Sequence, residues 1–135
     1  MPEDCIFCRI LSGELPSFAV GENERAYAFA DISPATRGHS LVIPRVHAND
    51  IHDVAPEDLT ACALLAKDVA ARAVARLHAD GVNLLNSAGA AAWQTVFHFH
   101  IHVIPRYERD PLRLPWTPVP ADQGEIAAAA AQLRG

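Results

Sequence analysis

Hydrophobic and polar positions alternate along the first third of the chain, a pattern typical of β-strands. Residues 17–21 and 25–31 alternate well enough for two strands, and Glu22-Asn23-Glu24 between them favours a hairpin turn. Residues 40–44, SLVIP, are an apolar and β-branched run that predicts a third strand. Pro44 has no backbone N–H, so we expect it to limit how far this strand pairs.

Helical spacing is clearest over residues 57–79, where apolar positions recur every three or four residues. Pro56 suits a first helical turn, and Gly81 is able to terminate the helix. The apolar stripe consists of Leu59, Cys62, Ala66, Val69, Ala73 and Leu77. The shorter stretch 5–12, CIFCRILS, has the same spacing and predicts a short N-terminal helix or turn.

The second half of the chain predicts two more strands and a tail of different character. The strands are expected at 82–86 and, longer, at 97–106. Four prolines between positions 111 and 120 predict an extended segment, and the alanine-rich residues 123–133 favour a terminal helix. Strands in hairpin order, with helices inserted and no regular βαβ alternation, indicate an α+β fold on an antiparallel sheet of about five strands.

Length, composition and charge narrow the classes of function. The chain has 135 residues, half of them hydrophobic, so we expect residues 1–135 to form a single domain around one core. A formal net charge of −5 argues against broad affinity for nucleic acid. The sequence contains no run of 18 apolar residues and no secretory signal at its start, so we expect a cytoplasmic protein without a membrane span.

Three of the seven histidines stand at alternate positions in HFHIH, residues 98–102. On a strand, His98, His100 and His102 share one face, while Phe97 and the residues between the histidines face the core. Neighbouring side chains on that face start roughly 6.6 Å apart, so two can share a metal ion but three converge only awkwardly. We expect the three histidines to have different roles; the alternative is three imidazoles on a solvated sheet face.

Cys5 and Cys8 form a C-x-x-C pair. The spacing suits two thiolates on one tetrahedral zinc ion, which would need two further ligands. Redox pairs share the spacing, but they are expected between a strand and a long helix. The third interpretation is two buried, apolar cysteines on a short helix.

Several motifs, in order along the chain, resemble those of the histidine triad (HIT) superfamily of nucleotide-binding hydrolases and transferases. The run from His98 to Val103, in which histidine alternates with apolar residues, is similar to the triad motif itself. The other similar segments are CIFCRI at 5–10, FADISP at 29–34, GHSLVIPRVH at 38–47 and QTVF at 94–97. The first of these resembles the N-terminus of zinc-carrying bacterial members, and the Hint-like branch fits best. The resemblance covers nearly the whole chain and implies a HIT-like fold.

The resemblance implies a mechanism by nucleotidyl transfer. His100 would attack the α-phosphorus of a nucleotide conjugate and form a nucleotidyl-histidine, which water then hydrolyses. An imidazole with an ordinary pKa of about 6.5 is largely neutral at pH 7 and needs no separate base to act as a nucleophile. His102 and His39 would hydrogen-bond the phosphate, and Gln94 and Thr95 would supply neutral donors near the leaving group.

The resemblance also implies a purine nucleotide pocket. Asp31 would accept hydrogen bonds from the two ribose hydroxyls, since a buried carboxylate among apolar residues needs donors. Asn86 would lie near the phosphate. The apolar slot around the base would consist of Ile6, Phe7, Ile10, Phe29 and Ile32, for most of which an ordinary core position is the alternative.

The zinc-carrying relatives imply one structural zinc ion per chain. Its ligands would be Cys5, Cys8, His47 and His98, a set with no open position. Hint-like proteins are homodimers, which implies the same assembly here. One departure is Trp93, because the family usually has glycine just before the step from glutamine to serine or threonine; we expect its side chain to narrow or stack on the leaving-group side.

The sequence therefore predicts an enzyme that releases AMP or GMP from purine nucleotide conjugates, in the manner of a phosphoramidase. A dinucleoside polyphosphate hydrolase would use the same His100 with a different leaving-group pocket. A nucleotide-binding or scaffold protein with incidental turnover is the alternative from another class. A further rival is a catalytic metal ion held by the triad.

Overall fold

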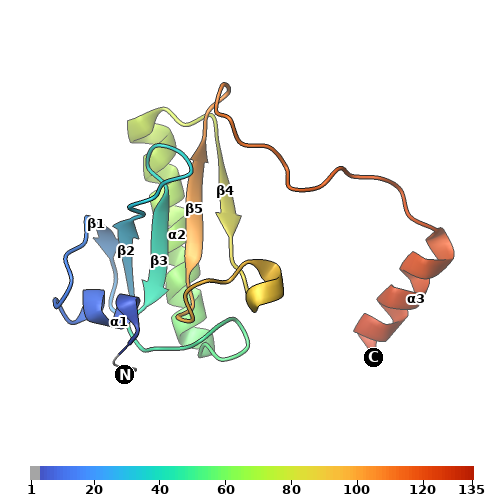
Figure 1. Ribbon diagram of the computed structural model, residues 1–135, viewed down its shortest axis with the longest axis horizontal. Helices are drawn as coiled ribbons and strands as arrows, with labels where there is room; N and C mark the ends of the chain where they lie inside the picture. Colours follow the sequence, from blue (N-terminus) through green and yellow to red (C-terminus); the bar gives the residue numbers. More distant parts are fainter. Residues whose placement is uncertain (1–3) are drawn as a thin grey trace.

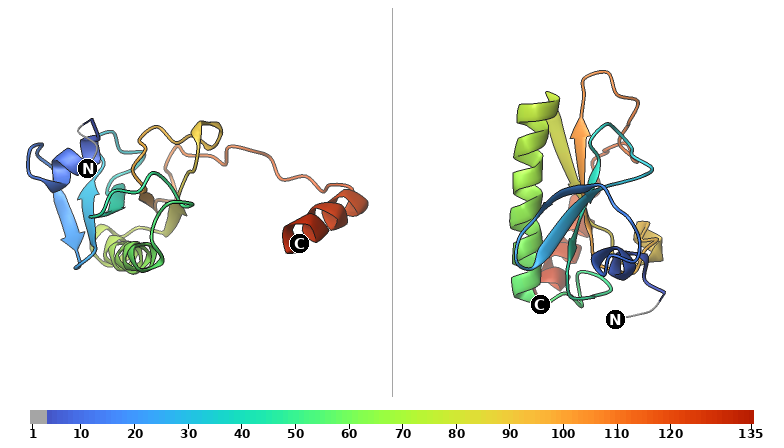
Figure 2. Two further views of the ribbon diagram at one scale, coloured as in Figure 1. Left: turned by 90° about the horizontal axis from the view of Figure 1, so that it is seen from below. Right: turned by 90° about the vertical axis from the view of Figure 1, so that its left-hand side faces the viewer.

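Five strands form one antiparallel sheet in the order β1-β2-β3-β5-β4, with a long helix across one face and a short helix at the other (Figures 1 and 2). This computed structural model describes residues 4–135. In chain order the elements are α1 (Ile6–Leu11), β1 (Ala19–Glu22), β2 (Ala26–Ala30), β3 (Ser40–Pro44), α2 (Pro56–Leu77), β4 (Gly81–Leu85), a 3₁₀ helix (Ala90–Ala92), β5 (Ile101–Arg106) and α3 (Gln123–Arg134). The expected α+β class, antiparallel sheet and short terminal helices are confirmed.

The long helix α2 ends earlier than the sequence suggested. His78, and not Gly81, takes the left-handed conformation that stops the helix, with φ 59°. Its backbone N–H donates to the carbonyl of Ala73. Gly81 is already the first residue of β4. A histidine can fill this position because polar residues enter the left-handed region more readily than β-branched ones.

The prediction of one strand over 97–106 was wrong at its beginning, because β5 starts only at Ile101. The ladder between β3 and β5 ends at the pair formed by Val42 and Ile101. Ile43 comes next along β3, and Pro44 after it has no N–H to offer to β5, as its identity led us to expect. The amide of Phe99 instead donates to the carbonyl of Ala48, at 2.6 Å, in the loop that follows β3.

The sheet carries apolar residues on both faces, and each face packs against a different helix. The face covered by α2 forms the larger cluster, with Val42, Phe99, Ile101 and Val103 packed against Cys62, Leu65 and Val69. The opposite face packs Phe29, Leu41 and Ile43 against Phe7 and Cys8 of α1. A helix on each face explains why all five residues of β3 are buried.

The alternation read from HFHIH continues through residues 98–100, although they lie outside the strand. Phe99 points into the α2 core and is fully buried, whereas His98 and His100 contact the ring of Phe7 on the α1 side. Phe97 departs from the expectation of a core position, because its side chain is 51% exposed. Phe97 lies before the chain enters the sheet at Ile101.

The C-terminal tail leads away from the sheet, and α3 stands clear of the rest of the chain in Figure 1. Asp122 caps the helix by accepting a hydrogen bond from the amide of Glu125. The helix buries none of its residues. Within residues 4–135, no helix combines the length and the hydrophobicity that crossing a membrane requires.

Candidate functional site

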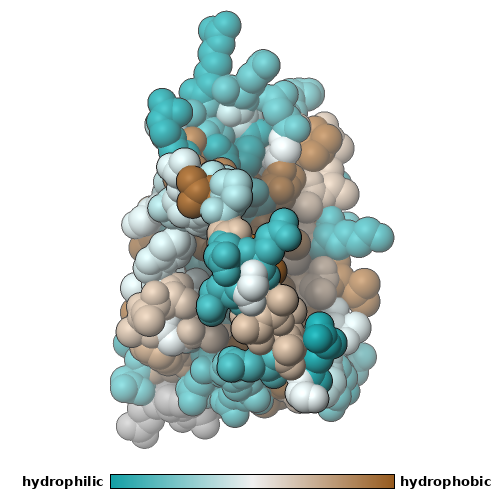
Figure 3. All heavy atoms as spheres, turned by 90° about the vertical axis from the view of Figure 1, so that its right-hand side faces the viewer, coloured by the Kyte–Doolittle hydropathy of each residue, from teal (hydrophilic) through white to brown (hydrophobic). Residues whose placement is uncertain are grey.

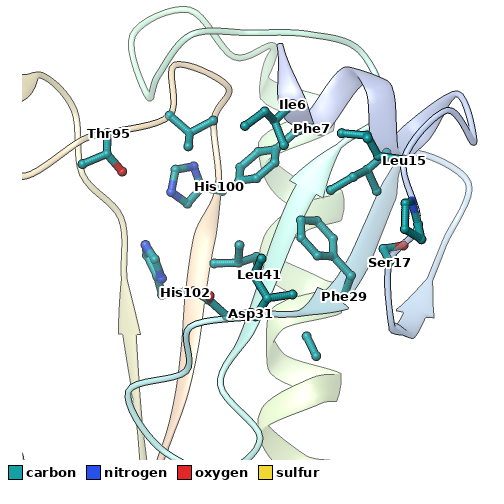
Figure 4. A pocket seen from close by; sticks show the side chains of 15 residues that line it. Ile6, Phe7, Leu15, Ser17, Phe29, Asp31, Leu41, Thr95, His100 and His102 are labelled. Carbon is teal, nitrogen blue, oxygen red and sulfur yellow. The ribbon is translucent and has the colours of Figure 1, made fainter.

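A pocket of about 440 Å³ opens on the α1 face of the sheet, between α1, the ends of β2 and β3, and the histidine segment (Figure 4). Nine of the site residues expected from the sequence line it: Ile6, Phe7, Ile10, Phe29, Asp31, Ile32, Thr95, His100 and His102. The rings of Phe7 and Phe29 meet edge to face at 5.5 Å. The lining is apolar on the side of α1 and polar where the histidines and Asp31 converge.

Six further residues line this pocket that sequence reasoning did not find: Leu15, Pro16, Ser17, Ala30, Leu41 and Val96. The first three belong to the turn after α1, whose position follows from packing rather than from any motif. Leu41 had a detectable signal in principle, because it is the cross-strand partner of His102 and so shares its face. That signal needs the register between β3 and β5, which the sequence alone does not supply.

The ring of His100 is held by one backbone bond that decides which nitrogen is reactive. Its Nδ1 lies 2.7 Å from the carbonyl oxygen of His98, and a carbonyl only accepts, so Nδ1 carries the proton. The neutral ring then keeps its free electron pair on Nε2. Asn86 steadies the same segment, because its Nδ2 donates to the carbonyl of His100 at 2.8 Å. His100 therefore presents a nucleophilic nitrogen.

His39 and His102 are linked through a chain of hydrogen bonds with a fixed direction. The amide of Ala35 donates to Nδ1 of His39 at 2.9 Å, so the proton of this neutral ring is on Nε2. That Nε2 lies 2.9 Å from Nδ1 of His102 and donates to it. His102 must then carry its own proton on Nε2. His102 is a pocket-lining donor, while its neighbour His100 is an acceptor.

Burial keeps these imidazoles uncharged. It lowers the pKa of His39 and of His100 below the ordinary value of 6.5, against an opposing effect of the Asp31 carboxylate. Burial, together with the neighbouring rings of His100 and His39, lowers the pKa of His102 to about 4. All three rings are therefore neutral at pH 7, as the assignment of donors and acceptors requires.

Asp31 directly follows β2 and lies on the polar side of the pocket. Its Oδ1 accepts a hydrogen bond from the amide of Ser33 at 2.8 Å, which orients the carboxylate. Its Oδ2 lies 3.6 Å from Nε2 of His39. A carboxylate has room for about four hydrogen bonds, so Asp31 keeps capacity for donors from a ligand.

Gln94 is placed differently from the expectation that it donates near a leaving group. Its Oε1 accepts from the amide of Gly89, and its Nε2 donates to the carbonyls of Asn49 and Val96. Both protons of the amide are thus engaged by the backbone, and the side chain is buried. Gln94 fixes the loop before the histidines, and Thr95 next to it reaches the pocket instead.

Cys5, Cys8, His47 and His98 converge beside the pocket and could hold a metal ion, since their ligand atoms all lie within 4.8 Å of one another. Sulfur and nitrogen stand 3.4 Å apart both for Cys5 with His98 and for Cys8 with His47. The two Nδ1 atoms of the histidines stand 3.2 Å apart. Ligands on a tetrahedral ion at ordinary bond lengths lie about 3.6 Å (S to N) and about 3.3 Å (N to N) apart. The four residues therefore fit such an ion.

The protonation of these four residues also suits a cation. Nε2 of His98 donates to the carbonyl of Pro44, and Nε2 of His47 donates to Oδ1 of Asn49, which leaves both Nδ1 atoms unprotonated. Burial lowers the pKa of His98 to about 4. Burial and the neighbouring Cys5 raise the pKa of Cys8 to about 11, so a bound cation is what would stabilise its thiolate.

Asp31, His39 and His102 also come close enough to be considered as metal ligands. They do not fit, because the amide of Ala35 already occupies Nδ1 of His39 and so places a proton on the Nε2 atom that would have to bind the ion. This argues against a catalytic metal among the histidines of the pocket. His52 and His78 are exposed and take no part in either site.

Comparison with known proteins identifies a single family. A family model described as the HIT domain matches residues 12–109. The chain is 49% identical over 105 residues to an uncharacterized 16.1 kDa HIT-like protein of Mycoplasma pneumoniae, covering 78% of this chain and 73% of that protein. It is 38% identical over 110 residues to the adenylylsulfatase HINT3 of Arabidopsis thaliana, covering 82% of this chain and 56% of that protein.

Solved structures agree with the fold. The structure of a Zn-bound histidine triad family protein from Mycobacterium smegmatis matches with a TM-score of 0.78 and 42% identity. The match covers 97% of this chain and 96% of that one, so it extends to the N-terminal cysteines as well as to the pocket.

Proposed function

The chain belongs to the HIT domain family, and on that premise we propose that it binds purine nucleotide conjugates and cleaves them at the α-phosphate, releasing AMP or GMP from P–N linkages. The observation that carries the proposal is the hydrogen bond from Nδ1 of His100 to the carbonyl of His98. It leaves the nucleophilic nitrogen of a neutral, buried imidazole in a pocket of nucleotide size, next to the ring of His102, whose free nitrogen Nε2 carries a proton and can donate.

The pocket suits a nucleotide in one orientation. The base lies among the apolar side chains of Phe7, Ile10 and Phe29, and the ribose hydroxyls donate to Asp31. The α-phosphate then reaches His100 and His102, which stand with their rings 4.9 Å apart. That the Arabidopsis relative is an adenylylsulfatase supports an adenylyl group in this orientation.

The reaction consists of two displacements on phosphorus. Nε2 of His100 attacks, the bond from phosphorus to the leaving nitrogen breaks, and that nitrogen departs with the electron pair and takes up a proton. Water then attacks the nucleotidyl-histidine, the electron pair returns to His100, and the proton of the water is released. The sum adds one water molecule across the P–N bond. Holding His100 in place makes both attacks intramolecular in effect.

The donors of the pocket act on the phosphate oxygens. His102 donates through Nε2, and its Nδ1 is held by His39, which is held in turn by Ala35. This arrangement keeps a neutral donor in position where negative charge accumulates during attack. Thr95 adds a hydroxyl on the same side.

Mass spectrometry of acid-quenched mixtures tests the proposal directly. The protein with adenosine 5′-phosphoramidate should show an added adenylyl group on the peptide containing His100, and His100→Ala should show none. AMP should appear in the first sample and not in the second. Tight AMP binding without turnover above that of the His100 variant would favour a nucleotide-binding or scaffold role instead.

We propose that the ion held by Cys5, Cys8, His47 and His98 is zinc, one per chain, because two thiolates and two imidazoles at tetrahedral spacing suit this metal. The Zn-bound histidine triad structure from Mycobacterium smegmatis supports this choice. All four ligands come from the chain, which leaves no open position for substrate. The ion would stabilise the fold by linking α1 to the segments around His47 and His98.

We also propose that the protein is a homodimer. β4 is an edge strand of the sheet, and its residues Leu84 and Leu85 are 55% and 38% exposed. Figure 3 views the molecule from the side of β4 and of the C-terminal tail, with α3 nearest the viewer, and shows hydrophobic and hydrophilic residues interspersed. A second copy paired along this edge would cover both the open strand and these side chains.

A further inference from the structure

Residues 32–38 belong to the loop between β2 and β3, and this loop supplies the donor that sets the direction of the hydrogen bond between His39 and His102. The amide of Ala35 donates to Nδ1 of His39, as described above. Ala35 is exposed, as are most residues of the loop. An exposed loop has little packing to hold it, so the position of this amide depends on what anchors the loop.

Thr36 is such an anchor, because it is the only buried residue among 32–38. Its hydroxyl donates to the backbone carbonyl of Pro105 in β5. The ladder between β3 and β5 ends before it reaches Pro105, so this carbonyl takes its partner from the side chain of Thr36. Figure 1 shows the loop beside the end of β5 at which the contact is made. The carbonyl of Thr36 also accepts the amide of His39, at 3.2 Å, which closes the turn.

Two other contacts of the loop are weaker candidates for this role. The Asp31 carboxylate lies 3.6 Å from Nε2 of His39, which is too long for a hydrogen bond. The hydroxyl of Tyr107 donates to the carbonyl of Arg37 at 2.8 Å, but this bond is at the surface, where water can take its place. The bond of Thr36 is buried and has no such substitute, so its loss leaves a carbonyl without a partner.

The direction of the bond between the two histidines matters because it is reversible. Each neutral ring has one donor and one acceptor nitrogen, so either ring can donate to the other. With the amide of Ala35 in place, His39 donates and His102 carries its proton on Nε2. Without that amide, Nδ1 of His39 would be free to take a proton and His102 would donate from Nδ1. Nε2 of His102 would then be an acceptor, which repels the oxygens of a phosphate.

We propose that Thr36 is a positioning residue, which anchors the loop of Ala35 and thereby keeps the proton of His102 on Nε2. Thr36 does not line the pocket and acts only through Ala35 and His39. Its effect on turnover rests on the proposed function of the pocket, whereas its effect on the tautomer of His102 does not.

Nitrogen NMR of protein with isotope-labelled histidine tests the proposal, because protonated and unprotonated ring nitrogens have well-separated resonances. Near neutral pH, Nδ1 of His102 in the native protein should give the resonance of an unprotonated nitrogen. Thr36→Val keeps the shape of the side chain and removes the donor, so a protonated Nδ1 should appear for His102. For adenosine 5′-phosphoramidate, kcat should fall about tenfold, in proportion to the share of molecules that keep the productive tautomer, and KM should change little.

A conservative variant and a matched control separate positioning from a general loss of stability. Thr36→Ser retains the hydroxyl and should retain the native tautomer and most of the turnover. Thr60→Val makes the same change at a threonine whose hydroxyl also donates to a proline carbonyl, that of Pro56 at 2.9 Å, away from the pocket. It should alter neither the His102 resonances nor kcat. If Thr36→Val does not fold, Thr36→Cys, a weaker hydrogen-bond donor, replaces it and should give a smaller change in the same direction.

The proposal is overturned if the folded Thr36→Val protein has the His102 resonances of the native protein, or if the tautomer changes and kcat does not. It is also overturned if Thr36→Ser or Thr60→Val loses as much turnover as Thr36→Val. Failure of the proposed function looks different, because the native protein would then release no AMP. In that event the His102 resonances of the Thr36 variants still decide whether Thr36 sets the tautomer.

Discussion

His39 and His100 are both histidines, but Nδ1 of one is bonded to a backbone donor and Nδ1 of the other to a backbone acceptor. The amide of Ala35 donates to His39, whereas the carbonyl of His98 accepts from His100. The ring of His39 thereby donates through Nε2, whereas the ring of His100 keeps a free electron pair on Nε2. The alternation of HFHIH predicted that the histidines share a face and divide their roles. It did not predict these backbone partners, since Ala35 has no side-chain signal at all.

The buried ring of His102 makes stability depend on pH. Its pKa is about 4 in the folded protein and 6.5 when unperturbed, so between these values the unfolded chain binds a proton that the folded chain does not. The free energy of unfolding should therefore fall as the pH drops from 6.5 to 4, by up to about 3 kcal/mol from this residue. Denaturant unfolding of the native protein and of His102→Gln at several pH values measures the effect. An equal loss in both proteins would contradict this account.

Trp93 occupies a conformation that favours glycine, with φ 74°, and its ring is mostly exposed. A left-handed conformation destabilises a residue other than glycine by about 1 kcal/mol or more. Trp93→Gly should therefore raise the melting temperature by a few degrees, even though it removes a large side chain. Trp93→Ala is the control, because alanine keeps the backbone strain and should give no such rise. Thermal unfolding followed by circular dichroism distinguishes the two.

At the scale of elements, periodicity predicted which strands and helices exist, and hydrogen-bonding partners determined where they end. SLVIP was predicted with its true ends because it is apolar throughout and finishes at Pro44. The start of β5 was missed because it depends on the loop of Ala48, which takes the amide of Phe99. Local sequence patterns also do not predict the register that brings Leu41 opposite His102. This register depends on two strands that are far apart in the sequence, with α2 and β4 between them.

The Cys and His cluster brings α1 together with the loops that contain His47 and His98, and metal content tests its role. Protein purified without added metal should contain about one zinc ion per chain by elemental analysis, and finding none would refute the assignment. Removing the ion with a chelator should lower the melting temperature, because α1 loses its connection to the loop of His47. Hydrogen exchange at the amide of Cys8 should become faster on removal. If the ion were catalytic, its removal would instead abolish activity and leave the melting temperature unchanged.

At the scale of the whole molecule, the two faces of the sheet differ, because one packs the main core and the other carries the candidate functional site. The α2 face holds the larger apolar cluster, and the α1 face holds the pocket and the four residues that could hold a metal ion. The order of the strands leaves β1 and β4 as edges. The sequence predicted the members of this arrangement through motifs and spacing. The meeting of α1 with residues 95–102 was implied only by the family resemblance, because no local pattern encodes the packing that produces it.

The exposed edge at β4 leads to a prediction about assembly. Leu84→Lys should convert a dimer into a monomer in light-scattering measurements, because a charge would be buried in the interface of both copies. Leu64→Lys changes a similarly exposed leucine on α2 and should leave the assembly intact. A native protein that is monomeric at micromolar concentration would rule out the proposed dimer.

Position 98 serves both sites through different parts of the same residue. The imidazole of His98 faces the cysteines, while its carbonyl oxygen orients His100. Every amino acid has that carbonyl, so a descendant that replaced His98 by an apolar residue of similar size would lose one of the four candidate metal ligands and retain the orientation of the His100 ring. The capacity to hold a metal could therefore be lost in evolution without altering the pocket beside it.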